Sequence, residues 1–211
     1  MTLADTATIA RLSVSRETFA ALEQLEQLVR RWTTAVNLVS KATLADLWQR
    51  HIVDSAQLFA FCPTEARSWL DIGSGGGFPG LVVAVLAREK LPALRVALVE
   101  SDQRKATFLR QAAQTLGLDV AVRSERVETI EPAQADVLSA RALAALIELL
   151  PYADRHLKPD GVALFPKGVR FAEEIAEARK AWGFDAVIHT SQSDAAAAIL
   201  EIRKIHRAKQ D

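Results

Sequence analysis

The chain has 211 residues, and 50% of them are hydrophobic, which is enough to bury one sizeable core. Its 26 Lys and Arg balance its 26 Asp and Glu, which excludes a strongly basic or acidic protein, so any site for a polyanion must come from a local cluster of charges. A single cysteine, Cys62, excludes an intrachain disulfide and favours a reducing compartment.

The first third of the chain has the spacing of helices. Apolar residues recur at steps of three and four over residues 17–36, which predicts an amphipathic helix. A second helix is expected over residues 44–61, between Thr43 as its N-cap and Pro63 after its end. Residues 1–66 are therefore expected to form an all-helical N-terminal extension.

The rest of the chain alternates between strand and helix patterns. Strands are expected at residues 68–73, 94–100, 119–124, 135–141, 161–168, 184–190 and 196–205. Helices are expected between them at residues 79–89, 102–116, 143–157 and 171–182. This alternation predicts a parallel sheet covered on both faces, with the last two strands as an antiparallel pair at one edge. Residues 67–211 are thus expected to form one α/β domain around a seven-stranded, mainly parallel sheet.

No segment predicts export or membrane insertion. Residues 1–20 carry charged side chains without a long apolar run, unlike a secretory signal. The longest apolar run, LVVAVLA, is far too short to cross a bilayer. We therefore expect a soluble protein of the cytoplasm.

The stretch DIGSGGGFPG, residues 71–80, places a glycine-rich turn between an expected strand and an expected helix. Glycine inside a regular element costs about 0.5–1 kcal/mol relative to alanine, so a bare backbone must be needed here. A strand that feeds such a turn into a helix is typical of nucleotide and anion sites, because the backbone approaches the ligand and the helix start offers free N–H groups. Pro79 suits the first turn of that helix.

Two familiar phosphate-binding templates do not fit this turn. Residues 75–80 have the glycine spacing of a P-loop, but Leu81 and Val82 follow where Lys and Ser or Thr are required. The dinucleotide fingerprint would begin at Gly73, but Phe78 occupies its third glycine position and would obstruct a pyrophosphate.

The remaining pattern is G-x-G-x-G over residues 73–77, with Asp71 ahead of it and Glu100 at the end of the next strand. This pattern resembles that of class I S-adenosylmethionine-dependent methyltransferases, which have a Rossmann-like fold. Their cofactor has no pyrophosphate, and its ribose requires a carboxylate at the position of Glu100.

The motif FPG after the glycines narrows the resemblance to one family, the bacterial 16S ribosomal RNA (guanine-N7) methyltransferases called RsmG or GidB. Five further stretches are similar to motifs of that family and occur in the same order over residues 17–207. They are NLVSKATLADLWQRHIVDS, ESDQRKATFLRQAAQTLGL, SERVE, SARAL and FPKG.

The resemblance implies transfer of a methyl group from S-adenosyl-L-methionine to N7 of a guanine in 16S ribosomal RNA, either free or in the small-subunit particle. It places Gly73, Phe78, Val127, Glu128 and Arg141 in the cofactor pocket, beside Asp71, Gly75 and Glu100 from the glycine pattern. The protein is expected to be a monomer.

Guanine N7 is a lone-pair nucleophile without a proton, so the reaction requires placement and no general base. No catalytic acid or base is therefore expected, although Arg141 suits guanine O6 or a phosphate. The alternative for Arg141 is an ion pair with Glu128 or another carboxylate. No metal site is expected, because the four histidines and Cys62 lack the spacing of metal ligands.

Two charged segments each allow two interpretations. Within RHIVDS, Arg50 and Asp54 share one helix face, and they form either a solvated ion pair or, given the resemblance, part of the active-site mouth. The terminal RKIHRAKQD has four cations against Asp211, and it is either a solvated tail or a contact for RNA phosphates.

Two other classes of function are compatible with parts of the pattern. A nicotinamide oxidoreductase would be expected to carry a Tyr-x-x-x-Lys pair, whereas the single tyrosine, Tyr152, is followed by His156 at that spacing. A non-catalytic module on the same fold would bind the cofactor without methylating RNA.

Overall fold

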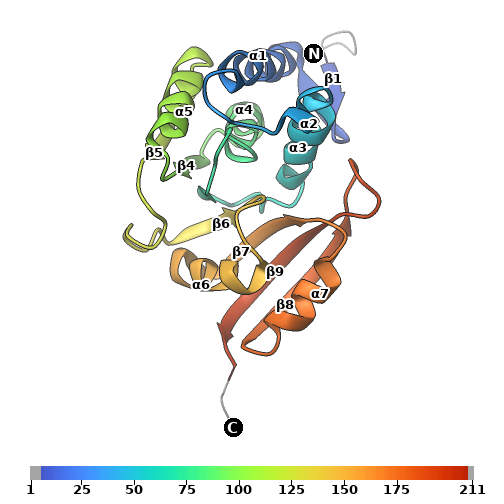
Figure 1. Cartoon of the computed structure of the whole chain (residues 1–211), viewed down its shortest axis with the longest axis vertical. Helices are drawn as coiled ribbons and strands as arrows, with labels where there is room; N and C mark the ends of the chain where they lie inside the picture. Colours follow the sequence, from blue (N-terminus) through green and yellow to red (C-terminus); the bar gives the residue numbers. More distant parts are fainter. Residues whose placement is uncertain (1–5, 209–211) are drawn as a thin grey trace.

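A seven-stranded sheet organises the larger part of the computed structural model, which describes residues 6–208 (Figure 1). Its strands lie in the order β5-β4-β3-β6-β7-β9-β8. They span β3 Ser68–Ile72, β4 Arg95–Val99, β5 Val120–Arg123, β6 Ala135–Ser139, β7 Leu157–Lys167, β8 Trp182–Thr190 and β9 Ala198–Arg207. Strands β3 to β7 pair in parallel, and β9 pairs antiparallel with both β7 and β8. This confirms the expected sheet and its antiparallel edge.

Helices cover both faces of the sheet. Successive side chains of a strand point to opposite faces, so buried strands present apolar side chains on both. On one face, Trp69 and Val137 pack in a core with residues of α1 Arg16–Thr33, α4 Gly80–Lys90 and α5 Gln103–Thr115. On the other, Leu70 and Leu138 pack with α6 Leu146–His156 and α7 Phe171–Ala178. The fold is thus a three-layer α/β sandwich, as the alternating pattern predicted.

The N-terminal region is not all helical, so that expectation is wrong for its first segment. Strands β1 Thr6–Ile9 and β2 Leu12–Ser15 form an antiparallel hairpin. Its turn residues Ala10 and Arg11 have φ of 46° and 64° without the glycine or asparagine that signals such a turn in a sequence. Ser15 then caps α1 by accepting a hydrogen bond from the Thr18 backbone N–H at 3.1 Å.

The expected helix over residues 44–61 is interrupted. The chain forms α2 Lys41–Leu44, a π-helix over Trp48–Val53 and α3 Asp54–Phe59. In the π-helix the Asp54 N–H reaches back to the Gln49 carbonyl, which adds a residue to the turn. Apolar spacing in the sequence does not reveal such an insertion. The division of the chain at residues 66/67 stays a prediction. Residues of α1, before that boundary, pack in one core with residues of α4, after it.

Helix α4 begins where the backbone comes closest to the sheet. A Cβ on Gly80 would lie 2.2 Å from Leu98 Cδ2 and 2.8 Å from Asp71 Oδ2. Glycine at this position therefore lets the helix start directly against β4. Among residues 6–208, no helix combines the length and the apolar character needed to cross a membrane.

We predict that Gly80→Ala lowers the free energy of unfolding by about 1–3 kcal/mol through overpacking, despite the better helix propensity of alanine. Urea unfolding followed by circular dichroism measures the change. Gly168→Ala is the matched control, because an added Cβ there meets nothing within 4 Å. An equal effect of both substitutions would contradict the packing argument.

Candidate active site

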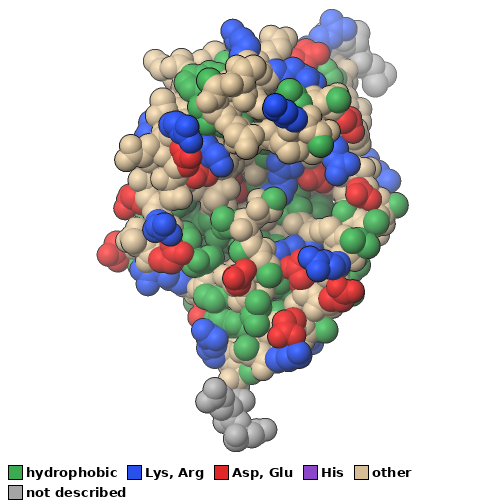
Figure 2. Space-filling view, viewed as in Figure 1, with side chains coloured by type: hydrophobic (Ala, Val, Ile, Leu, Met, Phe, Trp, Pro, Cys, Tyr) green, Lys and Arg blue, Asp and Glu red, His purple; other side chains and the backbone are tan. Residues whose placement is uncertain are grey.

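A cleft of about 800 Å³ opens at the carboxyl ends of the parallel strands. Figure 2 shows the cleft as a hollow in the middle of the face that is turned to the viewer, with charged side chains of both signs along its walls. The turns after β3, β4, β6 and β7 line it, together with residues from 38–54 and from the β8–β9 turn. The chain runs from β3 to β4 on one side and places β6 on the other, so the cleft lies at the switch point where α/β sheets bind ligands.

The glycine turn forms the floor of the cleft through Gly73, Gly75 and Phe78. Gly73 has a φ of +63°, in the left-handed region that disfavours a side chain. A Cβ at this position would also lie 2.6 Å from Leu143 Cδ1, in the turn after β6. Two turns from neighbouring strands therefore meet at a residue without a side chain.

Asp71 does not line the cleft but lies completely buried beneath the turn. Its Oδ1 accepts a hydrogen bond from the Ser139 hydroxyl at 2.6 Å, and its Oδ2 accepts one from the Gly80 N–H at 3.3 Å. Burial raises the pKa of Asp71 to about 6, while these donors and Arg141 lower it. The carboxylate thus connects β3, β6 and α4.

Glu100 lines the cleft at the end of β4, and it is only 7% exposed. Its Oε2 accepts from the Gly75 N–H at 2.8 Å, and its Oε1 accepts from the Asp102 N–H at 2.8 Å. These bonds fix the carboxylate against the glycine turn. Each oxygen keeps a further lone pair that a hydroxyl could use.

Val127 and Glu128 follow β5 and lie outside the lining of the cleft. The Glu100 N–H donates to the Arg123 carbonyl at 3.0 Å, so the end of β5 lies beside the end of β4. The Val127 carbonyl contacts His156 Nε2 at 3.1 Å, and Glu128 accepts from the Tyr152 hydroxyl at 2.6 Å. That hydrogen bond lowers the pKa of Glu128.

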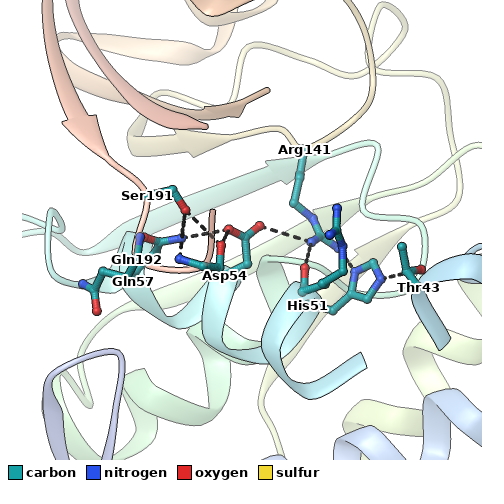
Figure 3. Close-up of polar contacts among 9 residues, drawn as sticks. Thr43, His51, Asp54, Gln57, Arg141, Ser191 and Gln192 are labelled. Carbon is teal, nitrogen blue, oxygen red and sulfur yellow. Dashed lines mark hydrogen bonds and ion pairs between the residues drawn. The ribbon is translucent and has the colours of Figure 1, made fainter. Parts of the chain in front are cut away.

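Arg141 enters the cleft from the turn after β6 and contacts the N-terminal region (Figure 3). Its Nη1 donates to the Arg50 carbonyl at 3.0 Å and lies 3.4 Å from Asp54 Oδ2. Burial lowers the pKa of the guanidinium, and Asp54 opposes this effect. The predicted alternative of an ion pair is therefore confirmed with Asp54, whereas Glu128 is not the partner.

His51 is held as a neutral acceptor. Arg141 Nη2 lies 2.6 Å from His51 Nδ1, and because arginine can only donate, Nδ1 must accept. His51 Nε2 then donates to Thr43 Oγ1 at 3.0 Å. Burial, followed by the charges of Arg141 and Arg50, lowers the pKa of His51 to about 3.

Phe78 supports this pair from below. Its ring centroid lies 5.0 Å from that of His51 and 5.2 Å from the Arg141 guanidinium carbon. Such a distance allows a cation–π contact. Phe78, which would obstruct a pyrophosphate according to the sequence analysis, therefore packs against two polar side chains of the cleft.

The RHIVDS segment lines the cleft, as the resemblance implied, through Arg50, His51 and Asp54. Sequence reasoning missed the β8–β9 turn, whose Ser193 hydroxyl donates to Asp54 Oδ1 at 2.7 Å. These residues are 139 positions apart, and no local pattern links them.

The basic C-terminal segment lies on β9, whose other end, at Ala198, lines the cleft. Its described cations already have partners: Arg203 contacts Glu201, Lys204 contacts Asp185, and Arg207 lies over the Trp182 ring. Lys209 and Asp211 lie outside the described residues.

We predict that His51 stays neutral in the folded protein between about pH 7.5 and pH 5, where an ordinary histidine titrates. Between pH 6.5 and pH 3, His51 binds a proton in the unfolded chain but not in the folded protein. Its contribution therefore lowers the free energy of unfolding as the pH falls through this range. Nitrogen NMR of the imidazoles tests the protonation state, and His51→Asn should flatten this part of the pH–stability curve. Titration of His51 near pH 6.5 would contradict the arrangement.

Comparisons with known proteins agree on one family. The family model described as "rRNA small subunit methyltransferase G" (GidB) matches residues 18–203. A protein of that name from Cereibacter sphaeroides is 52% identical over 203 residues, covering 96% of this chain and 98% of the relative. One from Ruegeria pomeroyi is 50% identical over 196 residues, covering 93% and 96%.

Solved structures with lower identity share the fold. The mitomycin 7-O-methyltransferase MmcR aligns with a TM-score of 0.58 at 19% identity, covering 92% of this chain and 69% of that one. The ribosomal protein L11 methylase from Lactobacillus delbrueckii subsp. bulgaricus aligns with a TM-score of 0.57 at 21% identity, covering 72% and 77%. The fold is therefore that of class I methyltransferases, and the chain belongs to the rRNA small subunit methyltransferase G (GidB) family.

Proposed function

We propose that the chain transfers a methyl group from S-adenosyl-L-methionine to N7 of a guanine in 16S ribosomal RNA. Membership of the family supports the activity on ribosomal RNA. The structural observation that carries the proposal is the Glu100 carboxylate, which lines the cleft and is fixed against the Gly75 N–H. A carboxylate in that position accepts the ribose hydroxyls of a nucleoside, while Phe78 occupies the glycine position that a dinucleotide's pyrophosphate requires.

The described residues fit such a cofactor. Glu100 would accept the ribose hydroxyls, and Gly73 would let the ligand approach the backbone where a Cβ has no room. The resemblance assigns the adenine to Val127 and Glu128, although both lie outside the lining of the cleft. Arg141 and Phe78 line the same cleft, and Phe78 lies beneath the guanidinium. Asp71 would act from beneath by fixing the turn.

When bound, the cofactor supplies an electrophilic methyl group on a sulfonium. Guanine N7 attacks through its lone pair and has no proton to lose, so the protein has to position the base and exclude water. The cleft agrees with this requirement. His51, which lines the cleft, has both ring nitrogens engaged by Thr43 and Arg141, and this leaves its imidazole unsuited to act as a base.

Two cations on the cleft wall are available for RNA. Arg50 is exposed and Lys105 half-buried, and the structure gives neither side chain an ion pair within residues 6–208. Both would contact phosphates, in contrast to the paired cations of β9. The monomeric state stays a prediction, and ribosomal RNA as substrate supports action in the cytoplasm.

We expect Glu100→Ala to weaken binding of S-adenosylhomocysteine at least about tenfold, or about 1.4 kcal/mol, because the ribose loses its acceptor. Gly73→Val should have a similar effect, since it fills the approach to the backbone. Isothermal titration calorimetry measures both, and Glu23→Ala, an exposed acid on α1, is the control. Unchanged affinity in both variants would refute the assignment of the pocket.

We expect the purified protein to place labelled methyl groups at N7 of a guanine in 16S ribosomal RNA from cells that lack it. Small subunits from the same cells should be compared with free RNA to identify the substrate. Labelling should require S-adenosylmethionine and vanish with RNA from wild-type cells, whose site is already methylated. Cofactor binding without methyl transfer to either substrate would indicate a binding module instead.

A further inference from the structure

We propose that Asp54 is a positioning residue that holds Arg141 in the cleft, and that the β8–β9 turn takes part through the Ser193 hydroxyl. This inference rests on the proposed function, in which Arg141 contacts a ligand. It assigns a role to residues from three parts of the chain that are distant in sequence: Figure 3 labels Asp54, Arg141 and, from the β8–β9 turn, Ser191 and Gln192, and the Ser193 hydroxyl lies 2.7 Å from Asp54 Oδ1.

Both oxygens of Asp54 are engaged. Oδ2 faces Arg141 Nη1 at 3.4 Å, while Oδ1 accepts from the Ser193 hydroxyl at 2.7 Å and from Gln57 Nε2 at 2.8 Å. The Asp54 side chain is 18% exposed and that of Arg141 is 15% exposed. At this degree of burial a charge requires a partner, so the carboxylate determines where the guanidinium rests.

The β8–β9 turn is itself fastened to α3. The Gln57 side chain donates to Ser191 Oγ at 3.1 Å, and it accepts from the Gln192 N–H at 2.9 Å. The Ser193 hydroxyl therefore reaches Asp54 from a turn that is tied at two further points. This arrangement keeps Oδ1 occupied and leaves Oδ2 directed at Arg141.

Arg141 retains hydrogen-bonding capacity for a ligand. Its Nη1 is used by the Arg50 carbonyl and Asp54, and one Nη2 hydrogen is used by His51. Within residues 6–208, the structure gives no partner to its Nε–H or to its second Nη2–H. Because Arg141 lines the cleft, these are the donors that would contact a carboxylate, a phosphate or guanine O6.

Loss of the Asp54 carboxylate would leave the Arg141 guanidinium less well oriented, although Asp54 itself does not contact the reacting atoms. The guanidinium would keep its contacts with Arg50 and His51 but lose its counter-charge. A ligand would then have to order the arginine on binding, which weakens transition-state stabilisation. The effect of Asp54 must therefore pass through Arg141, and this distinguishes positioning from a general structural role.

The test is a double-mutant cycle with Asp54→Asn, Arg141→Met and the double variant in the full chain. We expect Asp54→Asn to lower kcat/KM for small subunits about tenfold in the parent, and less than about twofold when Arg141 is already methionine. Ser193→Ala should lower it about threefold, again only while Arg141 is present. Asp46→Asn, an exposed acid in the same segment, is the matched control and should change kcat/KM less than about twofold.

Equal losses from Asp54→Asn in both backgrounds would overturn the proposal, as would no loss in the parent. If Asp54→Asn does not fold, as judged by its thermal unfolding midpoint, the cycle between Ser193→Ala and Arg141→Met decides the question in the same way. If the parent does not methylate RNA, the proposed function fails. The cycle is then measured on affinity for S-adenosylhomocysteine, where additive losses would overturn the positioning role separately.

Discussion

The buried carboxylate of Asp71 fixes the base of the glycine turn on which the cleft depends. Asp71 accepts from Ser139 on β6 and from the backbone of Gly80 at the start of α4, while Ser139 Oγ accepts from the Trp69 indole at 2.8 Å. A carboxylate removed from water is stable only when its oxygens are hydrogen-bonded. These bonds therefore hold two central strands and one helix in a fixed relation, and the position of Phe78 follows from it.

Hydrogen bonds and an ion pair fix the geometry of Arg141 and His51 in the cleft. Arg141 has its counter-charge in Asp54, and His51 remains neutral because its surroundings are buried and already cationic. This distribution suits methyl transfer to a nitrogen lone pair, for which the barrier falls through alignment of the two reactants. A reaction that removed a proton would require a free base here, and the imidazole of His51 is fully engaged.

The N-terminal region contributes directly to the site, although its sequence suggests a separate extension. Its π-helix directs the Arg50 carbonyl, His51 and the adjoining Asp54 towards the turn after β6. π-Helical turns often occur at functional sites, because the additional residue shifts the side chains that follow. The β8–β9 turn reaches the same point from the other end of the chain through Ser193.

The order of strands and helices in the α/β domain, the glycine turn and the acid at Glu100 could be predicted from the sequence, because hydrophobic periodicity and turn chemistry are local properties. Its six motifs also identified the family. Which groups meet became clear from the folded chain alone: Asp54 contacts Arg141, Ser193 contacts Asp54, and Asp71 lies beneath the cleft rather than within it. Contacts between residues far apart in sequence depend on how the strands are ordered in the sheet and how the turns at their ends pack, and no local pattern encodes that packing. The hairpin at residues 6–15 and the π-helix were not predicted for two local reasons. The hairpin turn lacks the residues that signal such a turn, and the π-helix differs from an α-helix by one inserted residue.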